Sequence, residues 1–355
     1  MDVEKIKALQ KQKQSELLSR SGVVSVGYGY KIVDGKITDE ICLIIGVKQK
    51  QPLGVISKKD IIPPSIDGIK TDVVEIGTIY AQGRKSKKAS VEVASIQAVD
   101  PKHKFRPAMP GCSIGVYSIT AGTFSCVVKK NGERMILSNN HILADCNQSR
   151  IGADIYQPGP SDHGSFLSKM ATLHQFVPLL FPGDESGNSD NPPKPSICPI
   201  AKKTASAANF VAKSLGRQHR LLAYNPQANV NYMDAAIAKP TTDDLIVDEI
   251  VHIGKPAGTI EATLGMEVQK YGRTTQYTTG KIIQLNATMD VNYGPGKLAR
   301  FEEQIVATNM SAGGDSGSCV LDMNKNIVGL LFAGSSTSTI LSPINKVFEF
   351  LGLSL

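Results

Sequence analysis

A glycine-dense turn at residues 313–318 constrains this chain more than any other segment. Its sequence, Gly-Gly-Asp-Ser-Gly-Ser, sets Ser316 among small residues. An apolar run begins directly afterwards at Cys319, a polar turn follows at 322–326, and a second apolar run leads to Phe332. Apolar runs bounded by turn residues in this way predict strand, hairpin and strand. The turn therefore opens a β-hairpin.

Such a turn suits a serine nucleophile. When a serine oxygen attacks a carbonyl, negative charge develops on the carbonyl oxygen, and fixed backbone N–H groups stabilise it. Glycines allow the main chain to come that close. The alternative is a surface loop in an ordinary β protein, and the short motif by itself favours that alternative.

A nucleophilic serine needs a general base, and the base needs a group that orients it. His141 follows an apolar run that begins at Met135, so we expect it at a strand end, where its side chain is both held and exposed. The other histidines lie in polar, basic or Pro/Gly-rich segments, where a solvated side chain is the simpler interpretation: His103, His163, His174, His219 and His252.

Asp234 is the candidate for the orienting group. It is a single carboxylate in the small and apolar stretch 231–238. Because burying an unpaired carboxylate is costly, the pattern predicts a partner for it. The alternative is an edge-strand aspartate that faces water, which this apolar context disfavours. The candidate residues therefore occur in the order His141, Asp234, Ser316.

These three contexts in this order resemble the trypsin/chymotrypsin-type serine peptidases, specifically their bacterial branch, over about residues 107–355. The segment 268–275 followed by Gly280 resembles one found in bacterial members of the fold, and Val328 to Gly334 resembles the strand that forms one wall of their substrate cleft. The nearest resemblance is to bacterial peptidases with a small extra N-terminal domain, which are related to the plant narrow-leaf type.

The resemblance implies a serine endopeptidase that hydrolyses peptide bonds through an acyl-enzyme. Ser316 would be the nucleophile, His141 the general base and then acid, and Asp234 the residue that fixes the imidazole tautomer. The N–H groups of Gly314 and Ser316 would form the oxyanion hole. No metal and no organic cofactor is implied, and the partners expected are protein or peptide substrates.

The resemblance also implies a cation for Asp315, since the aspartate before the nucleophile is buried in this fold. Bacterial relatives supply an internal arginine, and Arg273 matches it. We therefore expect an ion pair between Arg273 and Asp315 that forms the oxyanion hole without proteolytic activation. The alternative is a solvated Arg273 on a strand.

The substrate pocket departs from the family pattern. Met310 falls near the pocket base, where trypsin-like enzymes carry an acid, so specificity for Lys or Arg is not expected and an uncharged or apolar side chain is favoured. On the cleft wall, Phe332 replaces the usual serine and Ala333 replaces a frequent aromatic, with Gly334 next in sequence. A polar support for Asp234 is therefore missing from its usual place.

We expect a mostly β fold: a chymotrypsin-like double antiparallel β-barrel with a small N-terminal α+β domain and a C-terminal helix. Four regions are predicted: an N-terminal domain at 1–84, a basic linker at 85–106, a first barrel at 107–250 with a long insertion around 160–225, and a second barrel with the helix at 251–355.

Local patterns predict several elements. Asp2 can cap a helix that extends to about Ser19. Two alternating runs, 23–33 and 36–47, flank an Asp-Gly pair and predict a hairpin, and a third strand is expected at 71–76. The final segment predicts a helix with Ser342 as its cap, Pro343 at its first position and Gly352 just past its end. A mobile flap at 183–191, or alternatively an idle surface insertion, and a helix at 205–215 are expected within the insertion.

Composition excludes several function classes. With 41% hydrophobic and 20% charged residues, the chain has the make-up of a soluble globular protein. The net charge of +7 comes largely from local lysine runs without a nucleic-acid motif, so no nucleic-acid partner is expected. No apolar stretch is long enough for a membrane span, and no glycine pattern completes a nucleotide site. The six cysteines show no CxxC spacing, which favours reduced thiols and a cytoplasmic enzyme.

Two other functions remain open at this point. The chain could bind peptides in its cleft without turnover, which the changes at Phe332 and Ala333 allow. Alternatively, the N-terminal domain could dock a regulatory partner or inhibit the peptidase until a trigger arrives.

Overall fold

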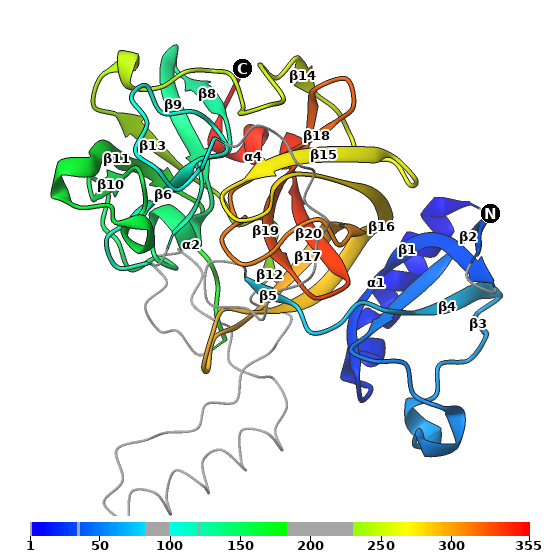
Figure 1. Ribbon diagram of the computed structural model, residues 1–355. Helices are drawn as coiled ribbons and strands as arrows, with labels where there is room; N and C mark the ends of the chain where they lie inside the picture. The colour runs from blue at the N-terminus through cyan, green and yellow to red at the C-terminus, as the bar shows by residue number, and fades with distance from the viewer. Residues whose placement is uncertain (1, 34–35, 82–98, 120, 183–229) are drawn as a thin grey trace, which may run out of the picture.

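The computed structural model describes residues 2–33, 36–81, 99–119, 121–182 and 230–355, and its strands form two large curled sheets (Figure 1). The seven-stranded sheet has the order β7-β6-β10-β11-β13-β9-β8. Its strands are β6 (Ser113–Val116), β7 (Gly122–Thr123), β8 (Val127–Lys130), β9 (Glu133–Ser138), β10 (Asp154–Tyr156), β11 (Lys169–Phe176) and β13 (Ala236–Pro240). A short helix, α2 (Asn140–Leu143), directly follows β9.

The second sheet contains the C-terminal strands. They are β12 (Val230–Asn231), β14 (Gly258–Thr259), β15 (Glu267–Gly272), β16 (Gln276–Asn292), β17 (Leu298–Thr308), β18 (Cys319–Asp322), β19 (Asn326–Gly334) and β20 (Ser338–Pro343). An apolar cluster with members from both sheets, including Leu137, Ile237 and Leu330, joins them. The C-terminal helix α4 (Ile344–Leu351) packs its buried Ile344 and Val347 into this cluster.

The N-terminal elements extend the second sheet. They are α1 (Val3–Ser19), β1 (Val23–Val33), β2 (Lys36–Val47), β3 (Ser65–Ile66), β4 (Ile69–Glu75) and β5 (Tyr80–Ala81). Strand β1 pairs antiparallel with β16, with Val26 opposite Thr288, so β1, β2, β4 and β3 continue the sheet outward. Helix α1 covers them, and its buried Gln10 donates hydrogen bonds to the carbonyl oxygens of Val26 and Asn286. The N-terminal elements are therefore docked on β16 by backbone pairing.

The predicted fold class is confirmed: the chain is mostly β, with two curled sheets like a double β-barrel and a C-terminal helix. Asp2 caps α1, as predicted, by accepting a hydrogen bond from the Glu4 N–H at 3.0 Å. Gly352 ends α4 in the left-handed conformation, but the N-cap of that helix is Pro343 and not Ser342. Within the described residues, the remaining helical segments are single 3-10 turns at Leu53–Val55, Lys58–Asp60, Pro160–Asp162, Phe166–Ser168 and Asp243–Leu245.

The expected insertion around 160–225 contains part of the first sheet. Strand β11 lies between β10 and β13, so residues 169–176 are structural there. The expected flap at 183–191 and the helix at 205–215 lie outside the described residues, as do the Asp34-Gly35 turn and most of the linker.

The described residues bear on two expectations from the sequence, that the cysteines are reduced and that no segment spans a membrane. Among the described residues, four cysteines are buried free thiols: Cys42, Cys112, Cys126 and Cys319. Within the same residues, no helix has the length and apolar content that crossing a membrane requires.

Candidate active site

His141 and Asp234 form a buried pair next to the first sheet. Strand β13 pairs with β9, with Ala236 opposite Ser138, and this register brings the residues just beyond each paired strand together. The Nδ1 atom of His141 lies 2.5 Å from Oδ2 of Asp234. The backbone N–H of His141 donates to the other carboxylate oxygen at 3.3 Å. The predicted partner of Asp234 is therefore His141.

A tyrosine that the sequence did not indicate also binds this carboxylate. The hydroxyl of Tyr293 donates to Oδ2 of Asp234 at 2.7 Å. Its ring stands edge-on to the His141 imidazole, with the ring centroids 5.7 Å apart. Burial, reinforced by the Asp234 charge, raises the pKa of Tyr293 well above its usual value, so the phenol remains a donor. Tyr293 therefore supplies the polar support for Asp234 that is lost where Phe332 replaces serine.

Ser316 lies in the turn between β17 and β18, and the glycines around it are required. Gly314 and Gly317 have φ of +101° and +92°, a region that side chains disfavour. A Cβ on Gly317 would collide with the Thr123 carbonyl and the Ser138 hydroxyl. The Thr123 N–H also donates to the Ser316 carbonyl at 2.7 Å. These contacts place the turn against the first sheet.

The Ser316 hydroxyl does not bond His141 in this structure. It donates to the carbonyl of Phe332 at 3.0 Å. The Nε2 atom of His141 is buried and has no hydrogen-bond partner among the described residues. Hydrogen bonds between a nucleophile and its base often tighten only when substrate is bound. The structure thus brings the three predicted residues into one region, with the serine turned towards the cleft-wall strand.

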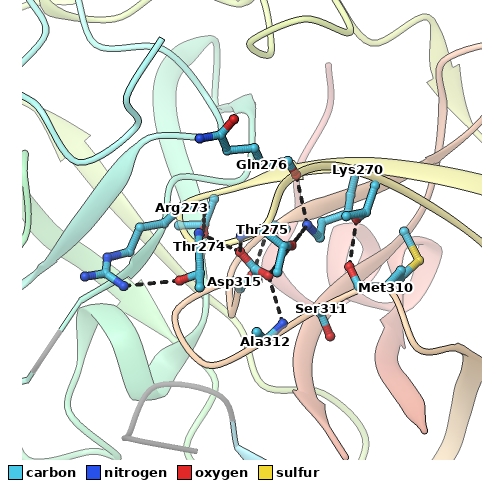
Figure 2. A network of polar contacts seen from close by, with 12 residues as sticks. Lys270, Arg273, Thr274, Thr275, Gln276, Met310, Ser311, Ala312 and Asp315 are labelled. Atoms are coloured by element: carbon cyan, nitrogen blue, oxygen red, sulfur yellow. Dashed lines mark hydrogen bonds and ion pairs between the residues drawn. The ribbon is translucent and has the colours of Figure 1, made fainter. Parts of the chain in front are cut away.

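Asp315 is the centre of a buried polar network (Figure 2). Its carboxylate accepts hydrogen bonds from the N–H groups of Thr274, Thr275 and Ala312 at 2.8, 3.1 and 2.9 Å, and from the Thr275 hydroxyl at 2.6 Å. The ammonium of Lys270 lies 3.6 Å from Oδ2, and both side chains have 0% exposure. Burial lowers the pKa of Lys270, and the Asp315 charge opposes that shift. Lys270 is therefore the cation of this network.

The expected pair between Arg273 and Asp315 is wrong. Arg273 binds Asp162 through Nε at 2.6 Å and Nη2 at 2.5 Å, and Asp162 also accepts from the Ser113 hydroxyl. Its guanidinium points away from Asp315 in Figure 2. Arg273 follows the end of β15, whereas Lys270 lies within the strand with its side chain buried. The argument used for Asp234 would not have found Lys270, because the same strand also contains Glu267 and Gln269.

Of the predicted pocket residues, Phe332, Ala333 and Gly334 lie in β19, and Met310 lies just after the end of β17. Met310 is buried in an apolar cluster, its N–H donates to the Thr339 hydroxyl, and its carbonyl accepts from Thr278. Phe332 packs against Phe301, with ring centroids 4.7 Å apart. Ala333 and Gly334 pair with β20 on one side and with β5 on the other. Among the described residues, no acidic side chain forms a hydrogen bond with Met310.

Comparisons with known proteins find similar peptidases. Residues 215–339 match the model of Peptidase family S64. Glutamyl endopeptidase 2 of Streptomyces griseus is 29% identical over 163 residues, which cover 43% of this chain and 81% of that protein.

Solved structures of serine proteases are also similar. A glutamic acid specific serine protease, described as using a novel histidine triad in substrate binding, has a TM-score of 0.43 at 17% identity and covers 70% of this chain and 100% of its own. Protease A of Thermobifida fusca has a TM-score of 0.43 at 16% identity and covers 70% and 97%.

The resemblance to trypsin/chymotrypsin-like serine peptidases is confirmed, and so is the prediction of a serine-type endopeptidase.

Proposed function

We propose that this endopeptidase cleaves peptide bonds with Ser316 as nucleophile, His141 as base and Asp234 as the residue that orients His141. The observation that carries this proposal is the buried His141–Asp234 pair, whose Nδ1–Oδ2 distance is 2.5 Å while Nε2 is left without a partner. The ionised carboxylate accepts the Nδ1 proton, so Nε2 presents a lone pair. That lone pair can take the Ser316 proton once the hydroxyl turns away from Phe332.

The reaction then proceeds in two halves. Ser316 Oγ bonds to the substrate carbonyl carbon as its proton passes to His141 Nε2, and the resulting oxyanion faces the N–H groups of Gly314 and Ser316. His141 returns the proton to the leaving amine, the C–N bond breaks, and an acyl-enzyme forms. Water repeats the sequence in place of serine, which releases the acid product and restores Ser316.

We further propose a preference for a non-basic side chain before the scissile bond, with glutamate as the specific candidate. The hydroxyls of Thr278 and Thr339 contact the Met310 backbone, and the described structure places no carboxylate there to attract Lys or Arg. The similarity to glutamyl endopeptidase 2 favours glutamate. No histidine follows His252 in this chain, so a histidine triad in the second sheet could not be the means of recognising it.

Sequencing the products of a proteome-derived peptide library tests this function. We expect wild type to release peptides that end in glutamate or an uncharged residue, and Ser316→Ala to release none above background. The matched control is the same library incubated without enzyme. Cleavage mainly after Lys or Arg would contradict the proposed preference, and equal cleavage by Ser316→Ala would contradict the proposed mechanism.

A further inference from the structure

Strand β5 lies on the strand that resembles the wall of the substrate cleft. It pairs antiparallel with β19, with Ala81 opposite Ala333 and Tyr80 opposite Gly334. On its other side it meets the end of β16, where the Asn292 N–H donates to the Ile79 carbonyl at 3.1 Å. Figure 1 shows this short N-terminal strand near β16 and β19. The N-terminal segment therefore occupies a backbone edge of the peptidase.

From its N-terminal to its C-terminal end, β5 proceeds along β19 towards Ser316, the proposed nucleophile. Because β5 is antiparallel to β19, it proceeds from the Gly334 end of that strand towards Phe332. The Phe332 carbonyl accepts the hydrogen bond from the Ser316 hydroxyl. An extended peptide that binds a sheet edge does so through main-chain hydrogen bonds. One edge cannot pair with two strands at once, so β5 and a substrate exclude each other here.

The side chains of this segment alternate between buried and exposed. Ile79 and Ala81 have exposed fractions of 1% and 8%, whereas Tyr80, on the opposite face, is 43% exposed. Ile79 and Ala81 belong to the apolar cluster that also holds Tyr293 and Phe332. The segment thus packs next to the residues that support Asp234.

Contacts of the residues just before β5 hold the strand in place. The side chains proposed for catalysis are buried. The Ser335 hydroxyl donates to the Ile76 carbonyl, and Gly77, with φ of +74°, lies against the Ser335 side chain. Ser316 has an exposed fraction of 0% and His141 of 5%. In this structure Ser316 is therefore buried, and the β19 edge that leads towards it is occupied.

We propose that β5 is an intramolecular occupant of the site that binds the main chain of a peptide substrate, so that the N-terminal segment blocks the peptidase in cis. This inference rests on the proposed function of Ser316. Substrate binds only the fraction of molecules whose β19 edge is free, so the apparent affinity for substrate falls by that fraction. The substrate residue that replaces Ala81 has a small apolar side chain, because that position is buried against the cleft wall.

Releasing β5 in the full-length protein tests the proposal. Ala81→Asp puts a charge into the apolar cluster, which favours departure of the strand. We expect kcat/KM for an extended peptide substrate to rise about tenfold or more, since each tenfold corresponds to about 1.4 kcal/mol of lost β5 binding. Tyr80→Phe is the matched control, because its ring is exposed and its backbone pairing is unchanged, and we expect wild-type rates from it. Equal kcat/KM in wild type and Ala81→Asp would overturn the proposal.

A second variant and a binding readout keep the test decisive. If circular dichroism shows that Ala81→Asp does not fold, Tyr80→Pro is used in its place. Proline releases β5 because it removes a backbone donor from the strand. A capped peptide with the sequence of residues 76–81 should inhibit the released variant at a lower concentration than wild type, and equal inhibition would count against cis blocking. If Ser316 were not the nucleophile, neither wild type nor any released variant would show Ser316-dependent hydrolysis, which separates failure of the function from failure of the block.

Discussion

Lys270→Met is expected to lower kcat/KM for peptide hydrolysis by roughly a hundredfold or more, because breaking one side of a buried ion pair costs about 3–5 kcal/mol. Asp315 would keep its hydrogen bonds from Thr274, Thr275 and Ala312 but lose its only nearby cation within the described residues. The turn that carries Gly314 and Ser316 would then lose the conformation that the proposed oxyanion hole requires. Steady-state kinetics and thermal unfolding of the purified variant measure the two effects.

Arg273→Met is the comparison that separates catalysis from stability. It should also lower the melting temperature, since Asp162 is buried and loses its partner. Its kcat/KM should fall far less, because Asp315 retains Lys270. The double variant Lys270→Met/Asp315→Asn removes both charges and should regain much of the unfolding free energy lost in Lys270→Met. Equal catalytic losses in Lys270→Met and Arg273→Met would contradict the assignment of Lys270.

The Lys270–Asp315 pair predicts the direction in which the unfolding free energy and the activity change with pH. Burial lowers the pKa of Lys270 below its ordinary value of 10.5. As pH rises through the folded-state pKa, the folded protein loses this proton before the unfolded chain does, so the lysine's contribution to the unfolding free energy rises towards pH 10.5. Activity should fall in the same window, because Asp315 loses its counter-charge. Both changes should be absent from Lys270→Met.

Tyr293→Phe is expected to lower kcat by roughly ten- to a hundredfold, because a hydrogen bond to a charged group contributes about 1.5–3 kcal/mol. The variant keeps the edge-on ring contact with His141 and removes only the hydroxyl that binds Asp234. KM should change little, since no substrate contact is lost. Stopped-flow and steady-state kinetics on one peptide substrate give the two constants separately.

Tyr277→Phe is the matched control for Tyr293→Phe. It removes a hydroxyl that donates to Gln269 at 3.2 Å, away from the His141–Asp234 pair. We expect wild-type kcat from it. The proton NMR signal of His141 Nδ1–H should shift in Tyr293→Phe and stay in place in Tyr277→Phe. An unchanged kcat and an unchanged signal in Tyr293→Phe would show that the tyrosine does not position Asp234.

Much of the fold follows from local sequence patterns. The capped helix α1, the two long strands β1 and β2 and the amphipathic helix α4 depend on nearby residues, so their patterns were sufficient to predict them. The pairing of β1 with β16 joins segments more than two hundred residues apart, and nothing in either strand specifies that partner. Strand β5 is still harder to predict, because two residues carry no periodicity.

In the candidate site too, some residues could be predicted from local patterns and others could not. His141, Asp234 and the Ser316 turn each had a local signal: an apolar run before the histidine, a lone carboxylate in a small and apolar stretch, and dense glycines. Lys270 had no such signal, because Glu267 and Gln269 lie in the same strand, and the family pattern predicts Arg273 in its place. Tyr293 had none, because it follows β16 in a turn whose residues would suit any loop, and only the packed structure brings its hydroxyl to Asp234.

Covalent labelling of the full-length protein tests the central claim, that Ser316 is the nucleophile, most directly. Wild type and Ser316→Ala would be incubated with a fluorophosphonate, and the adducts located by intact mass and peptide mapping. The predicted result is a single adduct on Ser316 that is absent from Ser316→Ala. An adduct that forms equally in Ser316→Ala, or labelling of wild type only at other residues, would contradict the account.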